Sequence, residues 1–173
     1  MRKHIYLFLL AIFTLYPLGI QAQTLWQKSE YGMTAEQVKK LFPDAVHPKE
    51  TFINEEGEAE LLELNEITIV DEPFHVSFLF KDGGLTRVTL LLEGKKKFSE
   101  AFYVFEKLTK ALRAKYGSEL TSKVERGFLN LAKSSWLSHK TNIELTAMGV
   151  EAAGAAALFL NYGVKLSAEV DKL

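Results

Sequence analysis

The chain has 173 residues, of which 47% are hydrophobic and 25% are charged, with 21 lysines and arginines against 22 acidic residues and no cysteine. This composition excludes a disordered chain and is typical of a globular protein of one or two domains. A formal net charge of -1 argues against a strongly basic nucleic-acid binder. The absence of cysteine excludes disulfides, zinc–thiolate sites, iron–sulfur ligation and thiol catalysis.

Residues 1–22 have the order of a secretory signal peptide. Arg2 and Lys3 precede an apolar run, and a proline and a glycine then lead to Ala22. This order predicts cleavage after Ala22, which leaves residues 23–173 as a single α+β domain. The alternative is an uncleaved membrane anchor, for which the apolar run is short. Neither a lipidation cysteine nor an Asn-x-Ser/Thr sequon occurs, so we expect a periplasmic protein with no membrane span after cleavage.

The first element after this segment is a short helix. Thr34 and Gln37 have the spacing of a capping box, in which each side chain bonds the backbone N–H of the other residue. Val38 and Leu41 lie on one face of this helix. Pro43 predicts its end, because proline disfavours helical geometry in the preceding residue.

Residues 44–60 are polar and acidic and predict a loop. Its carboxylates lack the fixed spacing of a calcium-binding loop, so we favour a solvated segment over a calcium site. The following strand, Leu61 to Val70, changes its apolar parity between Leu64 and Ile67. Because a continuous strand cannot place both on one face, a bulge is expected near residues 65–66.

The clearest pair of strands follows, with even-numbered apolar residues on both. A two-residue Asp-Gly turn would place Phe78 opposite Arg87 and mix the two faces. A three-residue loop instead places Phe78 opposite Val88 and Val76 opposite Leu90, which keeps one face apolar. We therefore predict the three-residue loop.

A longer helix is expected next, with Ser99 as its N-cap and Gly117 as its C-terminal stop. Three or four further strands follow, and residues 150–157 are interpreted as a loop that enters the last strand. The predicted fold is therefore a two-layer α+β domain, in which two helices pack on one face of an antiparallel sheet of about six to seven strands. The element order is α-βββ-α-βββ(β).

Two resemblances accompany this order. The run Tyr31-Gly-Met-Thr-Ala-Glu-Gln-Val38 resembles the helix start of small bacterial envelope proteins of the BamE/SmpA type. The doubled order of helix and strands is similar to the tandem architecture of the β-lactamase inhibitor protein fold. Both resemblances imply a non-catalytic module that binds other envelope proteins. The chain differs from the lipidated envelope proteins because it has no cysteine to anchor it.

Most signatures of catalysis are absent from the sequence, and an enzyme would need a site assembled from residues distant in the chain. There is no nucleophile elbow, Ser-x-x-Lys motif, His-Glu-x-x-His motif, Walker A loop or dinucleotide-binding glycine motif. His47, His75 and His139 have no other histidine or close carboxylate at metal-ligand spacing along the chain. We therefore expect no catalytic residues, no metal ligands and no cofactor, and we expect no nucleic-acid partner.

The face of the sheet opposite the helices is the candidate binding surface, because it mixes apolar and polar side chains. A polar face with isolated leucines is the alternative interpretation. The candidate residues on this face are His75, Ser77, Leu79, Arg87, Thr89 and Leu91. The sequence thus favours a secreted periplasmic module that binds an envelope protein. Such a module would act in envelope assembly or as an inhibitor of another protein. The alternative is a carrier of a small apolar ligand, held in a pocket lined by Phe74, Phe78, Phe102 and Phe105.

Overall fold

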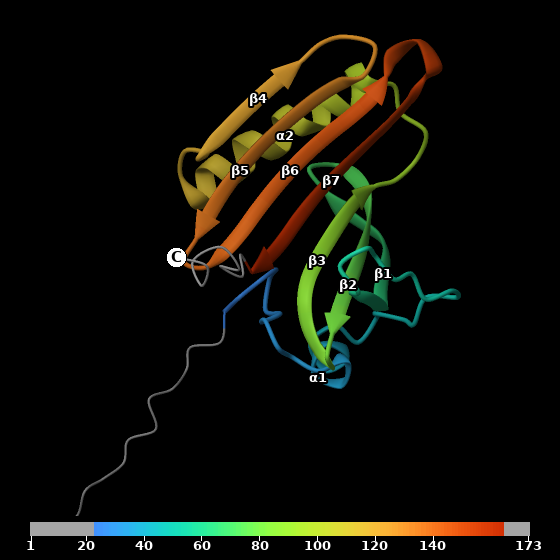
Figure 1. Cartoon of the computed structure of the whole chain (residues 1–173), viewed down its shortest axis with the longest axis vertical. Coiled ribbons are helices and arrows are strands. Elements are labelled where there is room, and N and C mark those ends of the chain that lie inside the picture. Colours follow the sequence, from blue (N-terminus) through green and yellow to red (C-terminus); the bar gives the residue numbers. More distant parts are fainter. Residues whose placement is uncertain (1–22, 165–173) are drawn as a thin grey trace, which may run out of the picture.

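The computed structural model describes residues 23–164, so the predicted signal peptide lies outside the described residues. Within this part of the chain, seven antiparallel strands form one sheet that carries two α-helices, which confirms the predicted α+β class (Figure 1). The elements in chain order are α1 (Ala35–Leu41), β1 (Ala59–Ile69), β2 (Glu72–Lys81), β3 (Gly84–Leu92), α2 (Phe98–Tyr116), β4 (Thr121–Glu125), β5 (Asn130–Ser138), β6 (Thr141–Val150) and β7 (Ala155–Val164).

The fold has two halves, a helix followed by three strands and a helix followed by four strands, and the strands of both halves form one sheet. The strand order is β1-β2-β3-β7-β6-β5-β4, so β7, the last strand among the described residues, lies at the centre and pairs with β3. This pairing runs from Arg87 opposite Gly163 to Leu91 opposite Phe159. In Figure 1, α2 lies behind β5 and β6, and α1 lies at the lower end of β2 and β3.

The β2–β3 hairpin has the predicted register but not the predicted loop. Phe78 pairs with Val88, as expected. The turn nevertheless contains two residues, Asp82 and Gly83, whose φ angles of 52° and 81° are those of the tight turn that Asp-Gly favours. A β-bulge at Thr86 supplies the missing residue and shifts the register by one. The three-residue loop is therefore wrong, because a bulge can reconcile the tight turn with one apolar face.

β1 contains the predicted irregularity. The pairing with β2 shifts between Leu64 and Ile67, and Glu66 within this bulge has a φ of 56°. A second register shift lies between Glu60 and Leu62. These bulges allow the strand to keep its leucines and isoleucines against the core despite their change of parity.

The capping box of α1 is confirmed. The Thr34 hydroxyl accepts a hydrogen bond from the Gln37 N–H at 3.3 Å, and the Gln37 side chain accepts one from the Thr34 N–H at 2.8 Å. The helix ends at Leu41, one residue before its C-cap, Phe42. The local sequence signals are therefore sufficient to place this short helix.

The N-cap predicted for α2 is wrong. The cap is Lys97, and Ser99 lies inside the first turn because the helix begins at the buried Phe98. The Glu151 carboxylate, from the short 3-10 turn between β6 and β7, accepts hydrogen bonds from the Ser99 N–H at 3.0 Å and hydroxyl at 2.9 Å. A carboxylate from a distant part of the chain therefore satisfies the helix start. The predicted stop at Gly117 is confirmed, with a φ of 85°.

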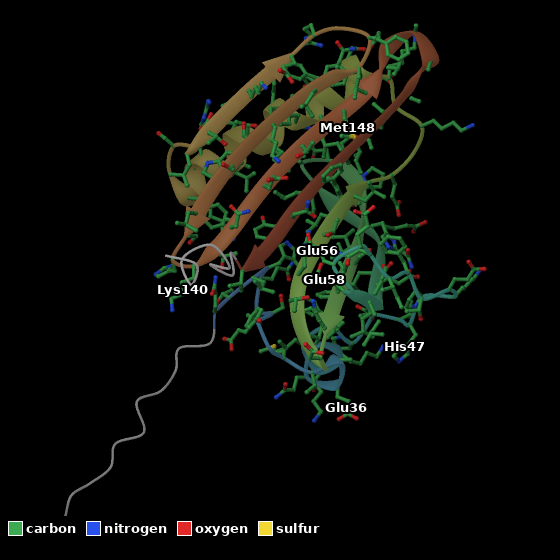
Figure 2. All side chains as sticks on the ribbon, in the orientation of Figure 1. Glu36, His47, Glu56, Glu58, Lys140 and Met148 are labelled. Carbon is green, nitrogen blue, oxygen red and sulfur yellow. The ribbon has the colours of Figure 1, made fainter. Side chains whose placement is uncertain are left out.

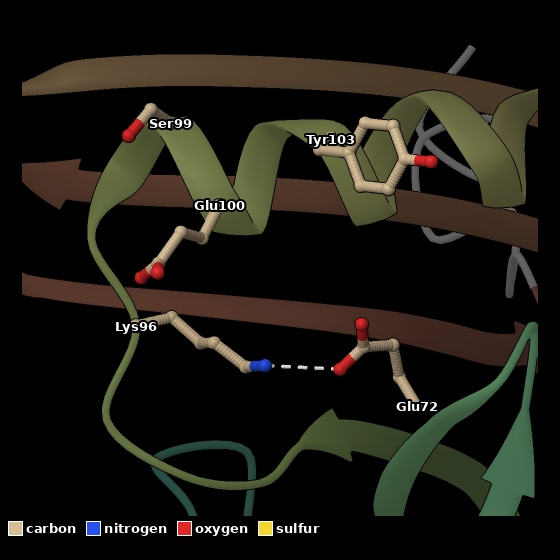
Figure 3. Close-up of a pocket in the computed structure, with 5 residues that line it drawn as sticks. All are labelled: Glu72, Lys96, Ser99, Glu100 and Tyr103. Carbon is tan, nitrogen blue, oxygen red and sulfur yellow. Dashed lines mark hydrogen bonds and ion pairs between the residues drawn. The ribbon is translucent and has the colours of Figure 1, made fainter.

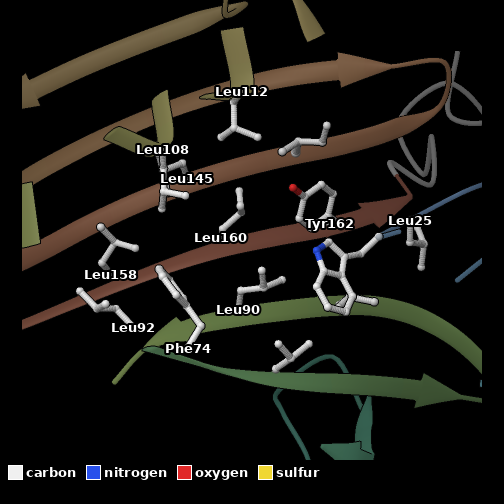
Figure 4. Packing of buried hydrophobic residues seen from close by; sticks show 14 of the residues in the cluster. Leu25, Phe74, Leu90, Leu92, Leu108, Leu112, Leu145, Leu158, Leu160 and Tyr162 are labelled. Atoms are coloured by element: carbon white, nitrogen blue, oxygen red, sulfur yellow. The ribbon is translucent and has the colours of Figure 1, made fainter. Parts of the chain in front are cut away.

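The core lies between the sheet and both helices. Phe42, which follows α1, lies with its ring centroid 5.1 Å from that of Phe78 on β2, and Trp136 of β5 donates a hydrogen bond to the Gly117 carbonyl at the end of α2. Cross-strand pairing places Phe78 and Trp136 on the same face, so both helices cover that face. Figure 4 shows how side chains of both halves fill this core; the labelled ones are Leu25, Phe74, Leu90, Leu92, Leu108, Leu112, Leu145, Leu158, Leu160 and Tyr162. Among residues 23–164, no helix has the length and hydropathy needed to cross a membrane.

We predict that Gly149→Ala destabilises the protein by about 1–3 kcal/mol, since overpacking a buried site forces the backbone to move. A Cβ atom at Gly149 would lie 2.5 Å from the Ala155 carbonyl oxygen and 2.7 Å from Ala156. Gly163→Ala on β7 is the matched control, because its Cβ would meet its nearest atom at 3.8 Å. The free energy of unfolding in urea measures both; equal stability of the two variants would contradict the prediction.

Candidate functional site

The open face is defined as the face of the sheet opposite the two helices. Cross-strand register arranges its side chains in rows. One row runs from His75 through Leu91 and Phe159 to Thr146 and Lys133. The next row contains Ser77, Thr89, Asn161, Glu144 and Ser135. The predicted surface, on β2 and β3, is thus part of a face that continues across β7, β6 and β5.

An apolar strip crosses the middle of the open face. Leu91 is 41% exposed and pairs with the half-buried Phe159 of β7. Met148, labelled in Figure 2, lies diagonally across from Phe159 and pairs with Leu131 of β5. Directly opposite and diagonal side chains on one face of a sheet are within contact range of each other. Leu91, Phe159, Met148 and Leu131 therefore form a continuous strip, called the apolar strip below.

The loop before β1 folds over one end of the open face. Glu56 and Glu58, labelled in Figure 2, both form ion pairs with Arg87, and the Arg87 Nε to Glu58 Oε2 distance is 2.9 Å. Lys81 also donates a hydrogen bond to the Glu56 carbonyl at 2.9 Å. Leu79, the neighbour of Arg87 across the β2–β3 pair, is only 6% exposed. The expectation that Leu79 is available on this surface is therefore wrong.

The row beside the apolar strip is polar. The Thr89 hydroxyl donates a hydrogen bond to Asn161 Oδ1 at 2.8 Å. Beside Asn161, a shallow cavity of about 120 Å³ is also lined by Arg87, Asn142 and Glu144. Ser77 and Thr89 pair across β2 and β3 and are half-buried. These groups form a polar row alongside the apolar strip.

At the outer edge of the open face, His75 lies among carboxylates of β1. Its Nε2 is 3.3 Å from Glu60 Oε1 and 3.8 Å from Glu63 Oε2. Its Nδ1 is 2.9 Å from Asn65 Oδ1, while Asn65 Nδ2 donates to Glu63 Oε1 at 3.2 Å. All three ionisable side chains are between 13% and 23% exposed. His75, Glu60, Glu63 and Asn65 are called the His75 cluster below.

The cluster changes the acidity of its own members. The hydrogen bond to Glu60 raises the pKa of His75 above its ordinary value of 6.5; partial burial opposes this, and the charges of Glu60, Glu63 and Glu93 add to it. The same hydrogen bond lowers the pKa of Glu60 below its ordinary value of 4.5, with a further contribution from the Ser77 hydroxyl. The pair is thus an ion pair between these two pKa values.

Sequence reasoning missed the His75 cluster. It placed no carboxylate near His75, but the β1–β2 register brings Glu63 opposite Ser77, directly next to His75 on the same face. The bulge at residues 65–66 was predicted, and it is what positions Asn65 beside the histidine. The pairing of β1 with β2 is the signal that could have located the cluster. Predicting that pairing requires the positions of both bulges in β1.

A second cavity lies away from the open face, at the start of α2. It has a volume of about 400 Å³ and is lined by Glu72, Lys96, Ser99, Glu100 and Tyr103 (Figure 3). The Lys96 ammonium is 2.9 Å from the Glu72 carboxylate within it. Charged and hydroxyl-bearing residues line this cavity, in contrast to the phenylalanine-lined pocket that the carrier hypothesis requires. Of those phenylalanines, the structure places Phe74, Phe78 and Phe105 in the core and leaves Phe102 partly buried.

Comparison of the chain with protein-family models, with curated proteins and with solved structures finds no match. The resemblances to BamE/SmpA-type proteins and to the β-lactamase inhibitor protein fold stay hypotheses from the sequence. The function proposed below is therefore argued from the open face itself.

We predict that the ion pair between His75 and Glu60 stabilises the protein most between about pH 4.5 and 6.5. The stability that His75 contributes is fully present below its unfolded-state pKa, where both the folded and the unfolded state carry the proton. It is lost as pH rises through the raised folded-state pKa. The contribution of Glu60 is present above 4.5 and is lost as pH falls through its lowered pKa. Because both groups are partly exposed, His75→Gln should cost less than about 1 kcal/mol.

Urea unfolding of wild type and His75→Gln in metal-free buffer, at pH 5.5 and pH 9, measures this difference. NMR titration of His75 gives its pKa directly, and Glu60→Gln should lower that pKa. An equal cost of His75→Gln at both pH values would contradict the prediction.

Proposed function

We propose that this protein is an exported periplasmic module without catalytic activity that binds another envelope protein through the open face. The observation that carries the proposal is the apolar strip, in which Leu91 is 41% exposed beside Phe159 on a face opposite both helices. Export rests on the signal-peptide order of residues 1–22. The partner is expected to be a protein, with an apolar patch of its own to cover the strip.

The dimensions of the open face fit a protein partner. Seven strands spaced about 4.8 Å apart span about 30 Å, and ten-residue strands are about 33 Å long. A standard protein–protein interface buries about 800 Å² on each partner, which this face can provide. A mixed sheet face of this size is larger than a small-molecule site requires.

The distribution of polarity also fits an interface. Interfaces have an apolar centre and a polar rim. Here the rim contains side chains that already pair with each other, including Lys133 with Glu144 at 2.8 Å and Arg87 with Glu58 at 2.9 Å. Because these charges are already paired, a partner can cover them without leaving an isolated charge buried. Most of the binding affinity would therefore come from contacts between the partner and the apolar strip.

The double variant Leu91→Ser/Phe159→Ser should weaken capture of the partner by at least about 30-fold, because buried apolar anchors carry about 2 kcal/mol or more of binding free energy. The exported protein is used as bait in a periplasmic extract, and native mass spectrometry identifies what binds. Tyr103→Ser is the matched control, since Tyr103 is 62% exposed but lies on α2.

Loss of a stoichiometric partner in the double variant but not in Tyr103→Ser supports the proposal, provided that circular dichroism shows both variants folded. Equal capture by both variants would contradict it. A retained small molecule without any protein would instead favour the apolar-ligand carrier predicted as the alternative.

A further inference from the structure

The His75 cluster has the composition and spacing of a metal site. One ligand atom from each of His75, Glu60 and Glu63 lies within 4.8 Å of the other two. Zn–N and Zn–O bonds are about 2.0–2.2 Å long, so two ligands of a tetrahedral zinc ion lie roughly 3.4 Å apart. The observed separations from Nε2, 3.3 and 3.8 Å, are close to that value. We propose that His75, Glu60 and Glu63 bind one divalent transition-metal ion, for which Zn²⁺ is the best match.

Asn65 fixes which nitrogen of His75 faces the carboxylates. The amide nitrogen of Asn65 must face Glu63, because a carboxylate only accepts hydrogen bonds. Its oxygen therefore faces His75 Nδ1 and accepts the proton on that nitrogen. Nε2 remains to face Glu60 and Glu63. A proton on Nε2 forms the ion pair described above, and a metal ion can take the place of that proton, because the neutral ring then offers a lone pair on Nε2.

Hydrogen bonds like those made by Asn65 support metal ligands in other proteins. A histidine that binds a metal usually donates its other N–H to an oxygen, which fixes the orientation of the ring. Here Asn65 does this for His75 and also holds Glu63. Asn65 occupies this position because of the β-bulge between Leu64 and Ile67. The bulge thus arranges both the ligands and their support.

The chemistry of the ligand set selects the ion. One imidazole with two carboxylates suits a borderline transition metal such as Zn²⁺, whereas Ca²⁺ and Mg²⁺ prefer oxygen ligands alone. The side chains are 13% to 23% exposed, so an ion can reach them from solvent. Three protein ligands leave a fourth tetrahedral position for water. This site does not depend on the protein-binding role proposed for the apolar strip.

Zinc chloride alone, titrated into the exported protein without a polyhistidine tag and followed by calorimetry, tests the site. We expect one equivalent to bind. Asn65→Leu should weaken binding about 10- to 100-fold, as loss of a supporting hydrogen bond does, and His75→Gln should weaken it more. His139→Asn is the control and should bind like wild type, because His139 lies at the β5–β6 turn.

NMR of the wild-type protein gives a readout that does not depend on any variant folding. Zinc should shift the Nε2 nitrogen resonance of His75 while Nδ1 keeps its proton. Absence of a one-equivalent binding event, or zinc binding that is unchanged in a folded His75→Gln, would overturn the proposal. A His75 ring that stays protonated on both nitrogens in excess zinc would also overturn it and would leave only the ion pair.

Discussion

The pairing of β3 with β7 is the interaction on which the rest of the structure depends. It joins the first helix and three strands to the second helix and four strands in one sheet. Because side chains alternate between the two faces of a strand, this one register aligns the apolar residues of both halves on the same side. Leu90 then pairs with Leu160 in the core, and Leu91 pairs with Phe159 on the open face. A shift of one residue would expose the core and bury the apolar strip.

Bulges resolve the conflicts between local turn preferences and this alternation. Asp82 and Gly83 favour a two-residue turn, whereas the apolar pattern of β2 and β3 requires an offset of one residue; the bulge at Thr86 satisfies both. In β1 a bulge turns Ile67 back toward the core and leaves Asn65 beside His75. The irregularity required for packing therefore also builds the His75 cluster.

The apolar strip and the His75 cluster on the open face suit different kinds of ligand. The apolar strip offers area without strong polarity, which suits the surface of another protein. The His75 cluster offers a small, negatively charged set of ligand atoms, which suits a cation. Because Leu91 pairs directly with His75, the two features are neighbours on the same face. A partner seated on the strip would lie close to any ion bound at the cluster.

The sequence by itself determined the elements and the faces. Capping residues placed α1, alternation placed the strands, and the change of parity between Leu64 and Ile67 located a bulge, because these signals act between residues close in the chain. Only the tertiary structure decided which strands are neighbours and what covers them. Glu151 at the start of α2, the loop carboxylate paired with Arg87 and the carboxylates around His75 all come from other parts of the chain. No local pattern encodes such contacts, because they arise from the sheet order and from the register of paired strands.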